Sequence, residues 1–452
     1  MPRTSLEQEI QQAGDPVTML RSSPASTYAI PGTPEYTNWR DEQVAWRETA
    51  VVFDQSSHMT DVYFRGPDVG RLLSDLGVNS IATFGRDRAK HFVACTEAGH
   101  VIGDAVLFGL EDDEVSLVGR PAVPNWVAFH AETGGYDVEV RRDERTVANP
   151  AGRLVFRYQL QGPMALRILE QARGGPIERI PFFRIGEFTL AGCPIRALNH
   201  TMSGVPGLET TGLEMTGPAE HGPAVMAALL AAGDEFGLRR GGVLAYPTTS
   251  FESGWIASPM PAIYSGEHMT AYREWLPGDG WEATASLGGS FTSGDIEDYY
   301  STPWDLGYGG LVRFDHDFLG RSALEQLADR PHRRKVWLHW DPDDVARVIR
   351  SSLFDPPGTR PKYLDIPKSV YATLPFDAVL SGDRLVGLSL YAGYTANIGG
   401  WVSLAMVDEA DAVDGAEAVV VWGEEDGGAA RPTVEPHVQT TIRARIGTRP
   451  PV

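Results

Sequence analysis

The pattern of apolar and polar residues predicts the same succession of strands and helices twice along this chain. The pattern then changes. Helical spacing over residues 40–50 leads into an alternating run from Val51 to Phe64, which predicts a strand, and further helix and strand patterns follow. The succession of strand, helix and strands returns after Arg153 and ends in a helical pattern over residues 223–236. A chain of 452 residues is too long for one core, and two rounds of similar size predict two related α+β subdomains.

The remainder of the chain has a different character. After Arg334, short β-branched stretches alternate with turns, which predicts an all-β end domain in the form of a small barrel. The segment from Tyr246 to Pro303 is rich in Gly, Pro and aromatic residues, and long loops of this kind commonly line a site or an interface. The expected parts are residues 1–150, 151–333 (with the site loops) and 334–452.

The composition argues against several classes of protein. A formal net charge of −21 disfavours nucleic acid or an anionic membrane as the main partner. The first residues lack an apolar signal core and no run approaches the roughly 20 apolar residues of a spanning helix, so we expect a cytoplasmic protein. Cys95 and Cys193 lie in apolar surroundings without CxxC spacing and are expected to be buried thiols. No phosphate loop, HExxH, GxSxG or strand-borne GxGxxG motif is present, so neither a nucleotide nor a metal is expected.

Four short segments in a fixed order carry most of the functional signal. They are residues 45–59, 160–165, 314–324 and 378–387. Together they resemble the folate-binding aminomethyltransferase family, whose founding member is the T protein of the glycine cleavage system. The resemblance implies an α+β fold with two folate-binding subdomains and a C-terminal β-barrel, and it implies tetrahydrofolate as the cofactor.

One branch of that family is more similar than the others, namely the tetrahydrofolate-dependent aryl-ether O-demethylases of the vanillate group. The similar stretches are residues 246–264, 272–277, 288–291, 296–300 and 306–308. The glycine cleavage protein carries an Asp-Asp pair, used on an amine donor, where this chain has Gly103-Asp104. The resemblance therefore implies transfer of a one-carbon unit from an aromatic ether to tetrahydrofolate, with a small-molecule aromatic ether as partner.

The same resemblance assigns proton chemistry to Tyr246 and His58. Cleavage of an aryl ether releases a phenolate, which must be protonated or hydrogen-bonded as its charge builds. A phenol matches the ordinary pKa of such a leaving group, so Tyr246 is the expected donor, and His58 is expected to bind the phenolic oxygen or relay a proton. Without the family match, a packed aromatic ring and a core histidine would explain these residues.

The resemblance also implies binding residues. A pterin edge needs a carboxylate to accept hydrogen bonds from its amino group and ring N–H, and Glu214 is the preferred candidate. Glu209 stays open as an alternative, because both residues follow a Gly-Leu doublet. Gln161 and Trp255 are expected to line the folate pocket, the latter by stacking. Arg120 is expected to bind a substrate carboxylate, although a folate contact or a tie between domains would also explain it.

Two positions depart from the vanillate pattern. Ile30 stands where a tyrosine is expected, and Ser57 replaces a histidine that precedes His58. Both changes make the expected substrate pocket less polar. They favour a bulkier or more neutral aryl ether, such as a methylenedioxyphenyl lignan of the sesamin type, over small acidic vanillate.

Two other functions stay open. An amine-donor transferase of the glycine cleavage or dimethylglycine type finds support in Asp104 alone. A folate-binding accessory protein without catalysis would use the acidic tail after Trp422 as an interaction surface, although a solvated charge run is the better explanation of that stretch.

Overall fold

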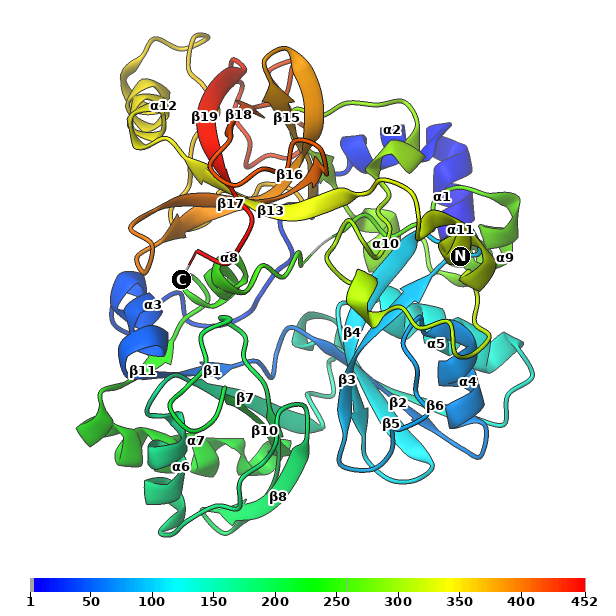
Figure 1. Ribbon diagram of the computed structural model, residues 1–452, viewed down its shortest axis with the longest axis vertical. Coiled ribbons are helices and arrows are strands. Elements are labelled where there is room, and N and C mark those ends of the chain that lie inside the picture. Colours follow the sequence, from blue (N-terminus) through cyan, green and yellow to red (C-terminus); the bar gives the residue numbers. More distant parts are fainter. Residues whose placement is uncertain (1–3, 258, 452) are drawn as a thin grey trace.

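Two helix-flanked β-sheets and a closed β-barrel make up the protein (Figure 1). The computed structural model describes residues 4–257 and 259–451. Within these residues no helix is both long and apolar enough to span a membrane. The expected α+β fold with a C-terminal barrel is confirmed.

The first sheet has five antiparallel strands in the order β3-β4-β5-β2-β6. Its strands are β2 (Thr60–Arg65), β3 (Ala89–Cys95), β4 (Val101–Gly109), β5 (Glu114–Gly119) and β6 (Glu139–Asp143). Helices α4 (Val69–Leu76) and α5 (Ala122–Thr133) pack against it.

The second sheet has six strands in the order β11-β1-β7-β10-β9-β8. Its strands are β1 (Ala50–Asp54), β7 (Val155–Gln161), β8 (Ile185–Leu190), β9 (Cys193–Asn199), β10 (Leu213–Pro218) and β11 (Leu238–Gly241). Helices α6 (Ala165–Arg173) and α7 (Gly222–Gly233) cover one face, and α3 (Trp39–Glu48) packs beside β1 and β11.

Strand β7 shows why this sheet has one apolar and one polar face. Phe156, Tyr158 and Leu160 alternate along the strand and enter the core beneath α6 and α7. Because successive side chains of a strand point to opposite faces, Arg157 and Gln159 point the other way, yet both are buried. The polar face of β7 is therefore covered by another part of the molecule.

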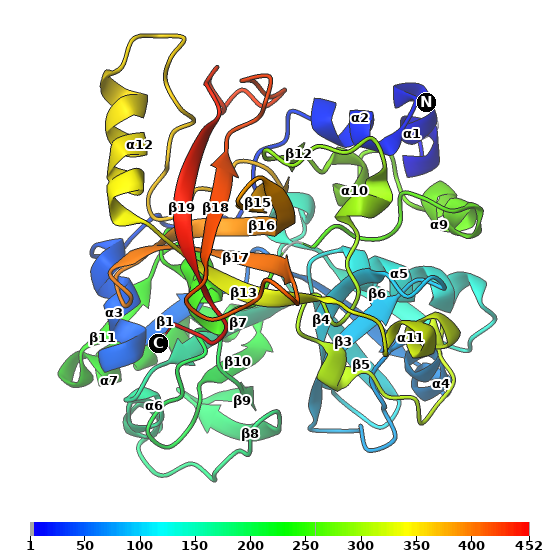
Figure 2. The same ribbon diagram turned by 45° about the horizontal axis from the view of Figure 1, so that its top comes forward.

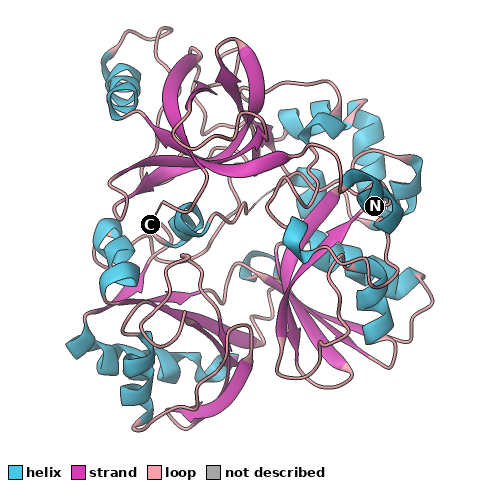
Figure 3. Ribbon diagram, in the orientation of Figure 1, coloured by secondary structure: helices cyan, strands magenta, loops and turns pink. Residues whose placement is uncertain are grey.

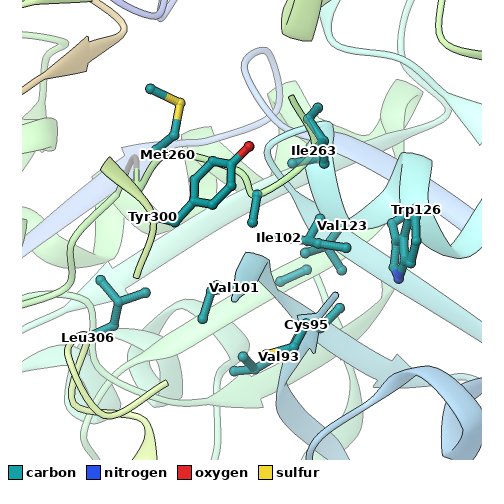
Figure 4. Close-up of a cluster of buried hydrophobic side chains, with 14 of the residues drawn as sticks. Val93, Cys95, Val101, Ile102, Val123, Trp126, Met260, Ile263, Tyr300 and Leu306 are labelled. Atoms are coloured by element: carbon teal, nitrogen blue, oxygen red, sulfur yellow. The ribbon is translucent and has the colours of Figure 1, made fainter. Parts of the chain in front are cut away.

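The two α+β bodies interleave along the chain. The run from Val51 to Phe64, predicted as one strand, is two strands in different sheets, β1 and β2. The prediction of a single strand was wrong because the polar residues 55–58 form a turn between them. Residues 260–306 likewise return to the first sheet. Figure 4 shows Met260, Ile263, Tyr300 and Leu306 packed with residues of β3, β4 and α5 in one core.

The barrel closes in the order β13-β17-β16-β15-β18-β19. Its strands are β13 (Arg333–Trp340), β15 (Asp377–Ser381), β16 (Arg384–Thr395), β17 (Gly400–Asp408), β18 (Glu417–Trp422) and β19 (Thr440–Gly447). One helix that we did not expect, α12 (Pro342–Phe354), lies on its outside (Figures 2 and 3). Asp341 caps this helix, accepting hydrogen bonds from the backbone N–H groups of Asp343 and Asp344 at 3.1 and 3.0 Å.

Short elements connect these bodies. The remaining helices are α1 (Leu6–Ala13), α2 (Pro16–Ser22), α8 (Thr249–Ser253), α9 (Thr270–Trp275), α10 (Trp281–Thr284) and α11 (Arg321–Leu327). The 3₁₀ turns are η1 (Thr146–Ala148), η2 (Ala219–His221), η3 (Asp234–Phe236), η4 (Tyr246–Thr248), η5 (Glu267–Met269), η6 (Ile296–Tyr299) and η7 (Gly309–Leu311). A two-stranded ladder joins β12 (Leu287–Gly288) to β14 (Leu374–Pro375) and ties the barrel to the first body. Both cysteines are buried and unbridged, as expected.

Candidate active site

A cavity of about 310 Å³ lies where the three bodies meet. Its walls come from the strap at residues 28–30, the β1–β2 loop, strands β3 to β5, the β9–β10 connection, residues 246–257 and β16. Most of the wall surface is apolar, and its apolar side chains include Ile30, Met59, Val106, Val118, Phe183 and Met202. Such a volume with few polar groups is typical of small-molecule sites.

A phenol and an imidazole meet on one wall. Tyr246, at the start of η4, lies with its hydroxyl oxygen 3.0 Å from Nε2 of His58 in the β1–β2 loop. The two rings pack edge to face with centroids 5.0 Å apart. Tyr28 fixes the loop by donating its hydroxyl hydrogen to the His58 carbonyl oxygen. The structure therefore brings together the two residues that the sequence assigned to proton chemistry.

Burial controls the charge of both groups. It lowers the pKa of His58 to about 3, with Arg120, Arg153 and Arg157 adding to the effect, so the imidazole is neutral at pH 7. Burial also raises the pKa of Tyr246 far above its ordinary value, and the negative charge of Glu214 adds to that shift. Tyr246 therefore remains a phenol and can serve as a donor. If it donates to a substrate oxygen, the Nε2 hydrogen of His58 points to the tyrosine oxygen.

The low pKa of His58 predicts that kcat stays constant as the pH is lowered below 7. A histidine of ordinary pKa would titrate near pH 6.5, whereas the depressed pKa of His58 keeps it neutral down to about pH 4. We expect kcat to show no His58-dependent loss between pH 8 and pH 5.5. The measurement is a pH–rate profile of the wild type beside His58→Gln. An acid limb with an apparent pKa of 6 to 7 that disappears in His58→Gln would contradict the neutral assignment.

Glu214 on β10 provides a buried carboxylate on another wall. It is 4% exposed; Arg157 donates a hydrogen bond to Oε1, and Nε2 of His200 lies 2.7 Å from Oε2. Burial alone would raise the pKa of Glu214, but the Arg157 charge and the His200 hydrogen bond outweigh it and lower the pKa to about 2. Glu214 is therefore ionised and keeps acceptor capacity on both oxygens. Glu209 is exposed on the β9–β10 connection and does not line the cavity, so the geometry favours Glu214.

A third polar group lies on β3 and β4. Asp104 Oδ2 is 2.6 Å from Nε2 of His91 and accepts a hydrogen bond of 2.9 Å from Nε1 of Trp255. All three residues line the cavity, and the Trp255 side chain is partly exposed at its rim. Trp255 is thus held by its indole nitrogen while its ring forms part of the wall.

Arg120 and Ile30 also line the cavity, whereas Ser57 and Gln161 do not. The Arg120 guanidinium lies 4.6 Å from the centroid of the Tyr28 ring. Ser57 lies within the β1–β2 loop, where its carbonyl oxygen accepts a hydrogen bond from the Thr146 backbone N–H.

Gln161 lies beneath the cavity wall. Its amide nitrogen donates to the carbonyl oxygen of Val205 at 2.9 Å and also to that of Thr211, while its oxygen accepts from the Met202 backbone at 3.2 Å. The structure thus corrects two expectations. Gln161 shapes the β9–β10 connection instead of lining the pocket, and Ser57 leaves the cavity walls to other residues.

The sequence did not identify several candidate functional residues. Gln55 lines the cavity, and its side-chain oxygen is buried without a hydrogen-bond partner among the described residues. Arg157, His200 and His91 hold the two carboxylates described above. The alternation of β7 placed Arg157 on the face opposite the apolar core, and this was the available signal.

These groups fit a reduced pterin. Glu214 offers acceptors for its amino group and ring N–H, the unpartnered Gln55 oxygen offers another, and apolar side chains cover the faces of a flat ring. Among the described residues no group of three His, Cys, Asp or Glu side chains is placed to hold a metal ion.

The fold and the site define a class, that of proteins with the aminomethyltransferase fold and a polar-edged cavity at the junction of its three bodies. The glycine cleavage system aminomethyltransferase T from Bartonella henselae shares this fold, with a TM-score of 0.61 over 95% of both chains and 18% identity.

Residues 23–259 match the GCVT N-terminal domain, and the chain belongs to that family. It is 43% identical to the syringate O-demethylase of Sphingobium sp. (strain NBRC 103272 / SYK-6) over 99% of this chain and 96% of the relative. It is 28% identical to the sesamin methylene transferase of Sinomonas sp. (strain No.22), over 92% and 89% respectively. An aminomethyltransferase of Streptomyces coelicolor is 27% identical over 85% of this chain and 86% of its own. The resemblance to aryl-ether O-demethylases is thereby confirmed.

Proposed function

We propose that the protein transfers a one-carbon unit from an aromatic ether to tetrahydrofolate and releases a phenol. The observation that carries the proposal is the Tyr246–His58 pair, which shares an apolar cavity with the ionised Glu214. The relatives named syringate O-demethylase and sesamin methylene transferase support the same chemistry. A cytoplasmic location is part of the proposal.

The residues have distinct roles in this reaction. Tetrahydrofolate supplies the nitrogen nucleophile that accepts the carbon, and Glu214, Gln55 and the apolar walls would hold its pterin. Tyr246 donates a hydrogen bond, and then its proton, to the ether oxygen as the carbon–oxygen bond breaks, and it regains a proton from solvent when the phenol leaves. His58, with its proton on Nε2, stabilises the tyrosine oxygen as that proton leaves. The apolar walls limit the competition of water for these hydrogen bonds.

A methoxylated benzoate is the donor that we favour. Arg120 is a guanidinium in the cavity wall, and such a group binds a carboxylate in a two-point contact. The argument for a more neutral donor rested on two substitutions, and only Ile30 lines the cavity. An amine donor would need Asp104, whose Oδ2 is already engaged by His91 and Trp255.

The test is incubation with tetrahydrofolate and a panel of donors, followed by mass spectrometry of both products. The panel contains syringate, vanillate, neutral methoxybenzenes, a methylenedioxybenzene and an N-methyl amine. We expect demethylated phenols and 5-methyltetrahydrofolate from the methoxybenzoates. Turnover of the amine alone would support an aminomethyltransferase. Folate binding without any product would support an accessory protein.

Replacement of Arg120 should separate acidic from neutral donors. In Arg120→Gln we expect KM for a methoxybenzoate to rise about 10- to 100-fold, the usual range for loss of a hydrogen bond between charged groups. KM for a neutral methoxybenzene should change little. Steady-state kinetics with both donors provide the measurement. Equal effects on both would show that Arg120 serves the folate or the protein structure instead.

A further inference from the structure

One guanidinium joins the two sheets beneath the cavity. Arg157 on β7 is 3% exposed, and it donates from Nη1 to Glu214 Oε1 on β10. From Nη2 it donates to Asp61 Oδ1 on β2 of the other sheet at 2.5 Å. The carboxylate that would meet the cofactor and a strand of the first body are thus bound to the same side chain.

The Asp61 end of this link leads to the proton-transfer pair. Asp61 lies three residues after His58, at the start of the strand that follows the β1–β2 loop. Arg153 donates to the other oxygen of Asp61 and lies 3.5 Å from Asp143 on β6. These ion pairs therefore connect Glu214 on β10 of the second sheet to Asp143 on β6 of the first sheet.

We propose that Arg157 is a positioning residue of the reaction, which holds Glu214 as a carboxylate and fixes it relative to β2, the strand that follows the His58 loop. This inference rests on the proposed function, because it assumes that Glu214 binds the pterin. Arg157 does not line the cavity, so it acts through its two carboxylate partners.

The groups around Glu214 explain why the charge of Arg157 controls the protonation state of that carboxyl group. Arg157 and His200 contact the carboxylate, and His58 and Tyr246 face it at longer range. Asp61 contacts Arg157, Arg153 contacts Asp61 and Asp143, and the charges of Asp61 and Arg157 act on Tyr63. Arg120 acts on His58 and Tyr246. Without Arg157, burial raises the pKa of Glu214 and only His200 remains in contact to oppose it. A protonated Glu214 carries a hydrogen where the pterin N–H groups need an acceptor.

The experiment compares tetrahydrofolate affinity across pH in Arg157→Gln and Arg153→Gln. Both variants remove one buried guanidinium of the same ion network, but only the first removes a partner of Glu214. Anaerobic calorimetry at pH 5.5 to 8 gives Kd. We expect a nearly constant Kd in the wild type and in Arg153→Gln, since Glu214 stays ionised throughout. In Arg157→Gln we expect Kd to rise towards low pH by up to about 10-fold per unit, the limit for one proton.

Arg157→Lys provides a second variant if Arg157→Gln does not fold. A lysine keeps the charge but lacks the fork that reaches both carboxylates. We expect a pH-independent Kd with a lowered kcat, because Glu214 remains ionised while its distance from the His58 loop is no longer fixed.

The outcomes separate the two proposals. A pH-independent Kd in folded Arg157→Gln, or a pH-dependent Kd in Arg157→Lys, overturns the proposed role of Arg157 but leaves the proposed function standing. A wild type that binds no tetrahydrofolate at any pH overturns the proposed function as well. A pH-dependent Kd in Arg153→Gln equal to that in Arg157→Gln would assign the effect to the whole network and also overturn the proposal.

Discussion

Replacement of Tyr246 by phenylalanine is expected to lower kcat by about 100-fold or more while tetrahydrofolate still binds. The size follows from loss of a general acid, which commonly contributes 10²- to 10⁴-fold. Tyr246 is partly buried, and its raised pKa keeps the proton on the phenol at every pH of interest. The variant keeps the ring, which packs against Phe53 with centroids 5.2 Å apart, so the cavity wall should be preserved. Single-turnover kinetics with a methoxybenzoate, together with calorimetry of tetrahydrofolate binding, provide the measurements.

His58 supplies the matched comparison. Tyr246→Phe leaves Nε2 of His58 without its 3.0 Å partner, so a modest loss of stability is expected from the unmet polar atom, about 1–3 kcal/mol. In His58→Gln the tyrosine stays, and the fall in kcat should be smaller than in Tyr246→Phe. Near-wild-type turnover in a folded Tyr246→Phe would remove this tyrosine from the mechanism.

The sequence predicted the β-barrel and the helices near residues 40–50 and 223–236, and its failures have local causes. Strands β1 and β2 are buried on both sides, with only their last residues exposed. The apolar residues of both strands therefore follow one another with the same spacing, and only the polar turn at residues 55–58 marks the change of sheet. Helix α12 had its own signal, since Asp341 followed by Pro342 is a strong helix start.

The sequence could predict those site residues that are recognisable from a single motif. Tyr246, His58, Glu214 and Trp255 line one cavity, as the resemblance implied. The partners of these groups could not be predicted, because pairing depends on which distant strands become neighbours. Arg157 lies 57 positions before Glu214 and contacts it because β7 and β10 are adjacent.

Removal of the Glu214 carboxylate should produce the second large effect. We expect Glu214→Ala to weaken tetrahydrofolate binding by about 10- to 150-fold, since a hydrogen bond to a charged group contributes about 1.5–3 kcal/mol. Anaerobic calorimetry at pH 7 provides the measurement. The substitution also leaves Arg157 with Asp61 as its carboxylate partner, and breaking a buried ion pair costs about 3–5 kcal/mol of stability. Glu214→Gln, which keeps the shape, should be compared for that reason.

Glu209→Ala is the control that the chain itself offers. Both glutamates follow a Gly-Leu doublet, but Glu209 is exposed and lies outside the cavity walls. Its removal should leave both the affinity and the free energy of unfolding unchanged. If Glu209→Ala weakened binding and folded Glu214→Gln did not, the pterin carboxylate would lie on the β9–β10 connection. That connection would then have to close over the cavity when tetrahydrofolate binds, and Arg157 would serve only to join the two sheets.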